Sequence, residues 1–310
     1  MREKPISWLV PDDWEPLAHL ELISIQLVDG YLSGRHRSLK KGGCSEFAQH
    51  RSYAPGDEVR HVDWRVYAKH DRYCIKQFEE ETNLNAVLVL DASGSMGFGL
   101  STRTKFACAR AACASLARLA LKQRDPVGLS IVSERGAPFL APRSAATQYA
   151  NIVELLGKVA PAGSPLLTSR LDELGKTVKR RGMFLIFSDF FVPQDQLLKV
   201  LKFLRANGHQ VCLFQTLAPE ELEFTFRRGS RFESLESDDD VVNLDPDTFR
   251  ETYIERMKAF LAGIRRICRE TGCDYVPMNT SRSVGVILAD FLRRRAQTRR
   301  AAVGNAELGS

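Results

Sequence analysis

The chain lacks several features that would assign it to a familiar class. No uncharged apolar run reaches the ~18–20 residues that a membrane-spanning helix needs, and the best candidate, 107–121, is interrupted by Arg110 and Arg118. No secretory signal pattern opens the sequence, because Pro11 and two aspartates cut the first apolar stretch short. The seven cysteines are odd in number, widely spaced and without a CxxC pair, which excludes a disulfide framework. These absences predict a reduced, cytoplasmic protein.

Motifs for nucleotide binding, acyl transfer and zinc are also missing. No complete Walker motif GxxxxGK[ST] occurs, the glycines after position 93 have the wrong spacing for GxGxxG, and there is no GxSxG elbow. The histidines between positions 36 and 70 fit no zinc-ligand signature. With 44 Lys+Arg against 38 Asp+Glu, the net charge of +6 is small for 310 residues and does not by itself indicate nucleic acid.

From residue 84 onward, short apolar runs alternate with amphipathic stretches. The run Ala86–Leu90 is apolar at every position, as expected of a strand covered on both faces. Similar runs follow at 127–132, 183–188, 210–217 and 273–278, and they are separated by helix-like stretches at 105–123, 148–159, 172–180, 196–206, 248–270 and 286–295. This alternation predicts an α/β fold with a doubly wound, mainly parallel sheet.

Composition divides the chain into four predicted parts. Residues 1–34 contain an amphipathic helix between Glu15 and Leu32. Residues 35–83 are basic and histidine-rich, with interleaved aromatic residues, and predict short strands and turns. Residues 84–295 form the α/β domain, and residues 296–310 are predicted to be a disordered tail.

Two aspartates stand where predicted strands end. Asp91 opens a tight turn that also carries Ser93 and Ser95, and Asp189 follows the run 183–188. Ligands of doubly wound sheets bind outside the carboxyl ends of the strands, so these side chains are expected to meet. A loop containing Ser164 would add another hydroxyl. Carboxylates and hydroxyls are the hard oxygen ligands that Mg²⁺ or Mn²⁺ prefers, and an acidic residue of a partner would complete the coordination.

The turn at residues 91–95 resembles a known metal site. Asp-Ala-Ser-Gly-Ser is similar to the DxSxS metal-ion-dependent adhesion site, or MIDAS, of von Willebrand factor A-type domains. By that pattern Ser164 stands in the place of the usual threonine, with Thr168 as the competing candidate, and Asp189 is the later aspartate. The resemblance implies a magnesium-dependent protein–protein interaction in which no bond is broken.

A wider set of residues resembles the signature of the DUF58 family, which joins a segment like 35–83 to an A-type domain. The residues are Phe47, Arg51, Tyr53, Gly56, Asp57, Arg60, Asp63, Trp64, Lys76, Phe78, Lys105, Asp125, Gly128, Pro219–Phe224 and Tyr253. Ala218 departs from the pattern, because many members have Asp before the proline. The resemblance implies a bacterial adaptor for a MoxR-type AAA+ ATPase in chaperone-like assembly or maturation.

Two alternatives remain open. A metal-dependent phosphohydrolase would use Asp91 as its nucleophile together with Asp189, although Ser93 stands where haloacid-dehalogenase-like phosphatases have an acidic residue. A nucleic-acid-binding protein would use the basic, aromatic segment 35–76. Acidic residues lie among those cations, which favours internal ion pairs or a protein-docking surface.

Overall fold

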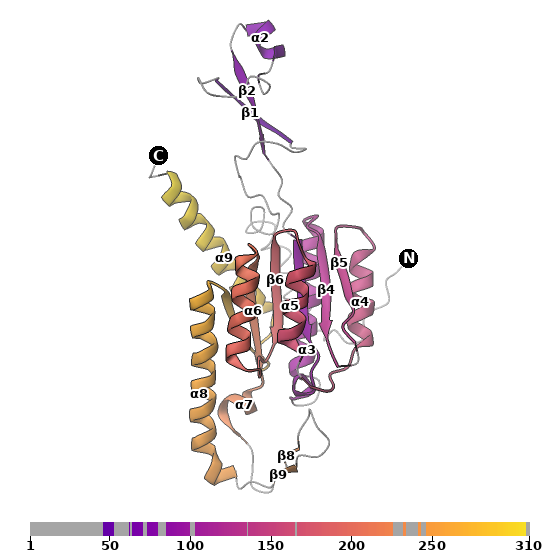
Figure 1. The fold of residues 1–310 in the computed structure, drawn as a ribbon, viewed down its shortest axis with the longest axis vertical. Helices are drawn as coiled ribbons and strands as arrows, with labels where there is room; N and C mark the ends of the chain where they lie inside the picture. The colour runs from indigo at the N-terminus through magenta and orange to yellow at the C-terminus, as the bar shows by residue number, and fades with distance from the viewer. Residues whose placement is uncertain are drawn as a thin grey trace.

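A computed structural model describes residues 46–52, 62, 64–70, 73–79, 85–99, 103–134, 136–164, 166–225, 232–233, 241–242 and 246–307. Its largest part is a six-stranded sheet with the strand order β10-β7-β6-β3-β4-β5 (Figure 1). The strands are β3 (Asn85–Asp91), β4 (Val127–Val132), β5 (Phe139–Arg143), β6 (Gly182–Ser188), β7 (Gln210–Leu217) and β10 (Asp274–Asn279). All neighbours pair in parallel except β5, which is antiparallel to β4. The prediction of a doubly wound, mainly parallel α/β sheet is confirmed.

Helices cover both faces of this sheet. The longer ones are α3 (Lys105–Lys122), α4 (Gln148–Lys158), α5 (Leu167–Thr177), α6 (Gln194–Ala206), α8 (Pro246–Thr271) and α9 (Val284–Glu307), and the short ones are η3 (Gly94–Gly97) and α7 (Pro219–Glu223). The helices α3, α4 and α9 pack on one face, and α5, α6 and α8 on the other. None of the helices in the described part of the chain is long and apolar enough to cross a membrane.

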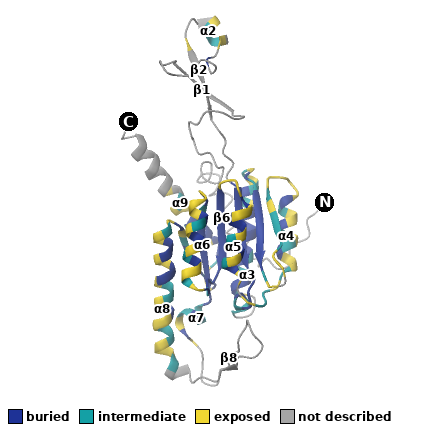
Figure 2. Ribbon diagram, viewed as in Figure 1, coloured by how far each residue is buried: buried dark blue, intermediate teal, exposed yellow. Residues whose placement is uncertain are grey.

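The central strand β3 shows why the sheet forms. Ala86, Leu88 and Leu90 face the helices of one layer, whereas Val87 and Val89 face the other. All seven residues of β3 are buried, and the neighbouring strand β6 is likewise drawn as buried in Figure 2, because a parallel strand flanked by two helix layers has no solvent face. Burial of each such Val or Leu side chain contributes roughly 1.5–3 kcal/mol. The apolar strands therefore fix where their polar carboxyl ends come to lie.

Three elements differ from the sequence prediction. The helix expected at 172–180 is α5, which begins at Leu167, because the leucines 167, 171 and 174 form one buried stripe. Helix α9 continues to Glu307, so 296–307 are helical where a disordered tail was predicted; its alanines and arginines are strong helix formers. Strand β5 was not predicted, because only its first residues are apolar and it lies at the sheet edge.

The described part of the basic segment is a small unit of its own. Strands β1 (Glu46–Ser52) and β2 (Cys74–Glu79) pair antiparallel, with helix α2 (Trp64–His70) between them in the chain. In Figure 1 this unit lies beyond the end of the sheet at which the parallel strands begin, and α7 lies near the opposite end. The predicted helix within residues 1–34 lies outside the described residues, and the three boundaries between the four predicted parts stay predictions.

Candidate metal centre

Asp91 lies at the carboxyl end of β3 and is only 1% exposed. Its Oδ1 accepts a hydrogen bond from the Ser93 amide (2.9 Å), and its Oδ2 accepts one from the Ser188 hydroxyl (2.6 Å). Both donors are neutral. Burial, and then the negative charge of Asp189, raise the pKa of Asp91 to about 6. The fold therefore fixes the orientation of this carboxylate and leaves its charge poorly compensated.

The hydroxyls of Ser93 and Ser95 meet beside this carboxylate, 3.2 Å apart. The loop around Ser164 is tied to the same turn, because the Gly94 amide donates to the Gly163 carbonyl oxygen at 2.8 Å and the Ala162 amide to the Ala92 carbonyl oxygen at 2.9 Å. Ser164 follows directly and is exposed. The backbone contacts thus bring the third predicted hydroxyl segment to the first two.

The competing hydroxyl, Thr168, lies within helix α5. Its Oγ1 donates to Oε1 of Gln196 on α6 at 3.3 Å. That contact turns Thr168 toward a neighbouring helix, whereas the backbone next to Ser164 pairs with the turn that follows Asp91. The contacts favour Ser164 over Thr168, and the ligand set itself stays a prediction.

Asp189, the second predicted carboxylate, is paired with a buried lysine. The ammonium of Lys105, the first residue of α3, lies 2.8 Å from Asp189 Oδ2 and 2.6 Å from Glu221 Oε1. The Lys105 side chain is 0% exposed and that of Asp189 is 2% exposed. The rings of Phe98 and Phe191 lie 5.9 and 5.0 Å from the ammonium, as in cation–π contacts.

Glu221 extends the cluster to the short helix α7. Its Oε2 accepts a hydrogen bond from the Ala218 amide at 2.9 Å, so one carboxylate caps α7 and binds the lysine at the same time. Burial raises the pKa of Glu221, and the positive charge of Lys105 opposes that rise. Burial and the charge of Glu221 raise the pKa of Tyr253, on α8, to about 12.

The turn after Asp189 is conformationally strained. Phe190 has a φ of 61° although it is neither Gly nor Asn, a conformation that costs on the order of 1 kcal/mol or more. Its amide donates to the Ser188 hydroxyl at 2.9 Å, and its buried ring packs in the core. These contacts hold the strained turn and with it the Asp189 backbone.

Sequence reasoning identified the aspartates but assigned no role at the centre to Ser188, Lys105 or Glu221. A signal for Lys105 was present, because a cation in the first turn of a helix is disfavoured by the helix dipole. Glu221 stands three residues after Ala218, the spacing of a capping box. Their contact with each other joins residues 116 positions apart, which no local pattern predicts.

The residues of this centre fit a hard cation. Their side chains offer carboxylate and hydroxyl oxygens, and among the described residues the two hydrogen-bond donors to the Asp91 carboxylate are neutral. Among the residues that the structure describes, no group of three or more His, Cys, Asp and Glu side chains is arranged to hold a metal ion. An ion at this centre would therefore depend on the serine hydroxyls as well as the carboxylates, which favours Mg²⁺ or Mn²⁺ over zinc.

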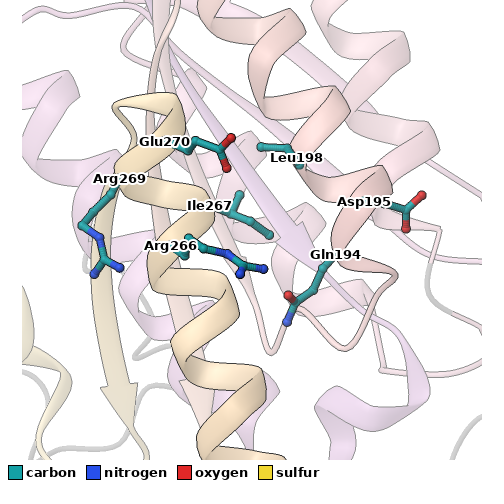
Figure 3. A pocket seen from close by; sticks show the side chains of 7 residues that line it. All are labelled: Gln194, Asp195, Leu198, Arg266, Ile267, Arg269 and Glu270. Atoms are coloured by element: carbon teal, nitrogen blue, oxygen red, sulfur yellow. The ribbon is translucent and has the colours of Figure 1, made fainter.

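A separate groove of about 800 Å³ lies between α6 and α8 (Figure 3). It is lined by Gln194, Asp195, Leu198, Arg266, Ile267, Arg269 and Glu270. Two acidic and two basic side chains balance each other along it. The groove contains none of the predicted metal ligands and is not part of the candidate centre.

Comparisons with known proteins agree with the resemblance seen in the sequence. The model of a family described as "Protein of unknown function DUF58" matches residues 49–260. Two proteins described as uncharacterized, from Mycobacterium bovis and Mycobacterium tuberculosis, are each 30% identical over 293 residues, which is 93% of this chain and 90% of theirs.

Solved structures that match part of this chain were also found. BatB from Bacteroides thetaiotaomicron is 13% identical, with a TM-score of 0.46 over 69% of this chain and 99% of that one. An aerotolerance-related membrane protein from Bacteroides fragilis is 14% identical, with a TM-score of 0.45 over 68% and 99%. The VWA domain of SpRpn10 is 10% identical, with a TM-score of 0.39 over 67% and 94%.

Proposed function

Because this chain belongs to the DUF58 family, as its sequence resemblance predicts, we propose that it is a non-enzymatic adaptor that binds a protein partner through a divalent cation. By analogy of fold alone, a von Willebrand factor A-like domain suggests a protein-interaction module, and the site has to supply the argument for its function. The ligands of Mg²⁺ or Mn²⁺ would be Asp91, Ser93, Ser95, Ser164 and Asp189. An Asp or Glu of the partner completes the coordination.

The proposal rests on the surroundings of the Asp91 carboxylate. Asp91 is buried at a strand end beside a second carboxylate, and its pKa is raised to about 6 by burial and by Asp189. A buried carboxylate with neutral donors is costly unless it gains a cation. An ion with hard oxygen preferences supplies that charge, and the nearby hydroxyls of Ser93 and Ser95 supply further ligands.

The same geometry favours binding over hydrolysis. A phosphohydrolase would need Asp91 accessible to a phosphorus atom, but this side chain is almost fully buried and both oxygens accept hydrogen bonds. Ser93, two residues on, cannot readily deliver a proton near neutral pH. A coordination position open toward a partner requires no such group.

The partner we propose is a MoxR-type AAA+ ATPase of the same bacterium, acting in the cytoplasm. The family resemblance supports this class of partner. An adaptor of this kind brings a client protein to the ATPase and uses the metal as a bridge, so its affinity for the partner depends on the ion.

The small unit β1-α2-β2 is proposed as a second contact surface. Trp64 and Tyr73 are 56% and 51% exposed. Tyr67 stacks on Tyr73 with 4.4 Å between the ring centroids, and Trp64 meets Tyr67 edge-on at 6.2 Å. Exposed aromatic clusters beside basic residues are typical of protein-binding surfaces.

Calorimetry on the purified chain tests the proposal. After chelator treatment, the wild-type chain is titrated with Mg²⁺ and Mn²⁺, alongside Asp91→Ala and a matched control, Asp172→Ala. Asp172 is a surface residue whose carboxylate pairs with Lys176 on the same helix. We expect saturable uptake by the wild type and the control, and a loss of at least about tenfold in affinity for Asp91→Ala, because a direct carboxylate ligand is removed.

A second arm measures the partner. The purified ATPase is captured on immobilised chain in Mg²⁺ and in EDTA. Capture that is lost in EDTA and in Asp91→Ala, but kept by Asp172→Ala, supports the adaptor function. Absence of cation uptake by the folded wild type at millimolar supply contradicts the metal site, and equal capture under all conditions contradicts metal bridging. Robust turnover of an aryl phosphate that disappears in Asp91→Ala favours the hydrolase.

A further inference from the structure

A lysine side chain that is wholly buried needs a physical reason. Lys105 has no exposed surface, and it begins helix α3, where the helix dipole disfavours a cation. Desolvation of an ammonium is unfavourable unless charged partners compensate for it. Asp189 and Glu221 supply that compensation at 2.8 and 2.6 Å. The lysine is thus part of one electrostatic unit with the proposed metal centre.

The charges of this unit do not cancel. Asp91, Asp189 and Glu221 bring three carboxylates, and Lys105 brings one ammonium. With all four ionised, two negative charges remain, which one divalent cation would neutralise. Without the ammonium, three negative charges would remain in the same buried volume, and without Glu221 only one would remain.

We propose that Lys105 is a specificity-determining residue of the metal centre: its buried ammonium sets the excess charge of the carboxylates to two and so matches the centre to a divalent ion. The inference rests on the proposed metal-binding function and extends it to a residue that does not itself bind the ion. Glu221 is the counterpart of Lys105, because it adds the third carboxylate charge from helix α7.

A purely mechanical role predicts something different. Lys105 joins the first residue of α3 to the end of β6 and to α7. If Lys105 only held these elements together, then either Lys105→Met or Glu221→Gln would loosen Asp189. Each variant would then lower the affinity for every cation by the same factor. Charge matching predicts opposite effects of the two variants on the preference between trivalent and divalent ions, and their cancellation in the double variant.

The test is a titration of the full chain with Mn²⁺ and with Tb³⁺, by calorimetry and terbium luminescence near neutral pH. The chains are wild type, Lys105→Met, Glu221→Gln and the double variant. Lys158→Met and Glu154→Gln are the controls, because they remove the same charges from an exposed pair on α4. Circular dichroism verifies that each variant is folded.

We expect Lys105→Met to raise the affinity ratio of Tb³⁺ to Mn²⁺ by about tenfold or more, and Glu221→Gln to lower it by a similar factor. A unit charge removed from a buried cluster changes the attraction of a trivalent ion more than that of a divalent ion. The double variant should return the ratio to within about threefold of wild type, as expected of charges that compensate each other. The surface controls should leave the ratio unchanged.

The outcomes separate the two proposals. The role of Lys105 is overturned, and the metal centre is kept, by either of two results. In the first, both single variants lose affinity for Tb³⁺ and Mn²⁺ by the same factor. In the second, the affinity ratio of Tb³⁺ to Mn²⁺ is unchanged while the wild type still takes up Mn²⁺. A folded wild type that takes up no Mn²⁺ overturns the metal centre, and the role of Lys105 with it. If Lys105→Met fails to fold, Glu221→Gln decides by itself: a lowered ratio supports charge matching, and an unchanged ratio overturns it.

Discussion

The hydroxyl of Ser188 donates a 2.6 Å hydrogen bond to Oδ2 of Asp91, which joins the carboxyl ends of the adjacent strands β6 and β3. The same hydroxyl accepts from the Phe190 amide, so one serine fixes both the carboxylate and the turn that follows Asp189. In the sequence, Ser188 is only the last residue of an apolar run. Its role follows from the pairing of two strands separated by 97 positions.

Ser188→Ala tests this positioning. Removal of the hydroxyl takes away a hydrogen bond that lowers the pKa of Asp91, so that pKa should rise further. The Phe190 amide also loses its acceptor, and we expect the free energy of unfolding to fall by about 1–3 kcal/mol. Calorimetry should show weaker Mn²⁺ binding.

The control for this variant is Ser115→Ala. Ser115 is also buried, and its hydroxyl donates to the Ala111 carbonyl oxygen within α3. Its loss should affect stability and leave Mn²⁺ affinity as in wild type. Equal Mn²⁺ affinities of Ser188→Ala and wild type would mean that the Ser188 contact does not orient a ligand.

The fold and the carboxylates could be predicted from the sequence because they depend on local patterns. Runs such as Ala86–Leu90 are apolar on both faces. An aspartate that follows such a run must lie at the carboxyl end of a parallel strand, where ligands of these sheets bind. The pairing of Lys105 with Glu221 could not be predicted, because it depends on β7 lying next to β6 and on where α3 begins. Strand order depends on the whole chain and cannot be predicted from a short stretch of sequence.

The backbone around the third hydroxyl offers another test. Gly163 has a φ of +74°, and a Cβ at this position would lie 1.9 Å from the Glu134 carboxylate. Its carbonyl oxygen accepts from the Gly94 amide. Gly163→Ala should destabilise the fold by about 1 kcal/mol through the left-handed φ and shift the segment that carries Ser164, which lowers Mn²⁺ affinity.

Gly136→Ala is the matched control, because Gly136 also has a positive φ, +137°, and open space around it. Thermal unfolding and calorimetry should show a loss of stability in both variants and a loss of metal affinity only in Gly163→Ala. Metal affinity retained in a folded Gly163→Ala would remove Ser164 from the proposed ligands.

His209 is expected to make stability depend on pH. It is buried, its Nδ1 accepts from the Gly182 amide at 3.2 Å, and burial lowers its pKa below the ordinary 6.5. As the pH falls, the His209 ring is therefore protonated in the unfolded chain before it is protonated in the folded chain. The contribution of His209 to stability is present above pH 6.5 and is lost as the pH falls through the lower pKa of the folded state.

Urea unfolding from pH 8 to pH 5 in roughly half-unit steps measures this effect. His209→Gln lacks the titrating ring, so the difference in unfolding free energy between the two chains should shrink or reverse at the acid end. Arg205, which donates to the His209 carbonyl oxygen, stays charged throughout and is common to both chains. A difference that is constant with pH would show that His209 does not titrate on unfolding.

Trp64 tests the second contact surface independently of the metal. It is exposed on α2, at the end of the molecule opposite α7 (Figure 1). Trp64→Ala should weaken capture of the ATPase by about tenfold, because exposed tryptophans commonly dominate interface energies, and should leave Mn²⁺ affinity unchanged. Val286→Ala, which removes an exposed apolar side chain from α9, is the control. Undiminished capture of the ATPase by Trp64→Ala would exclude this surface from the contact with the partner. Binding of RNA or DNA to the chain that falls steeply with added salt would assign the surface to nucleic acid instead.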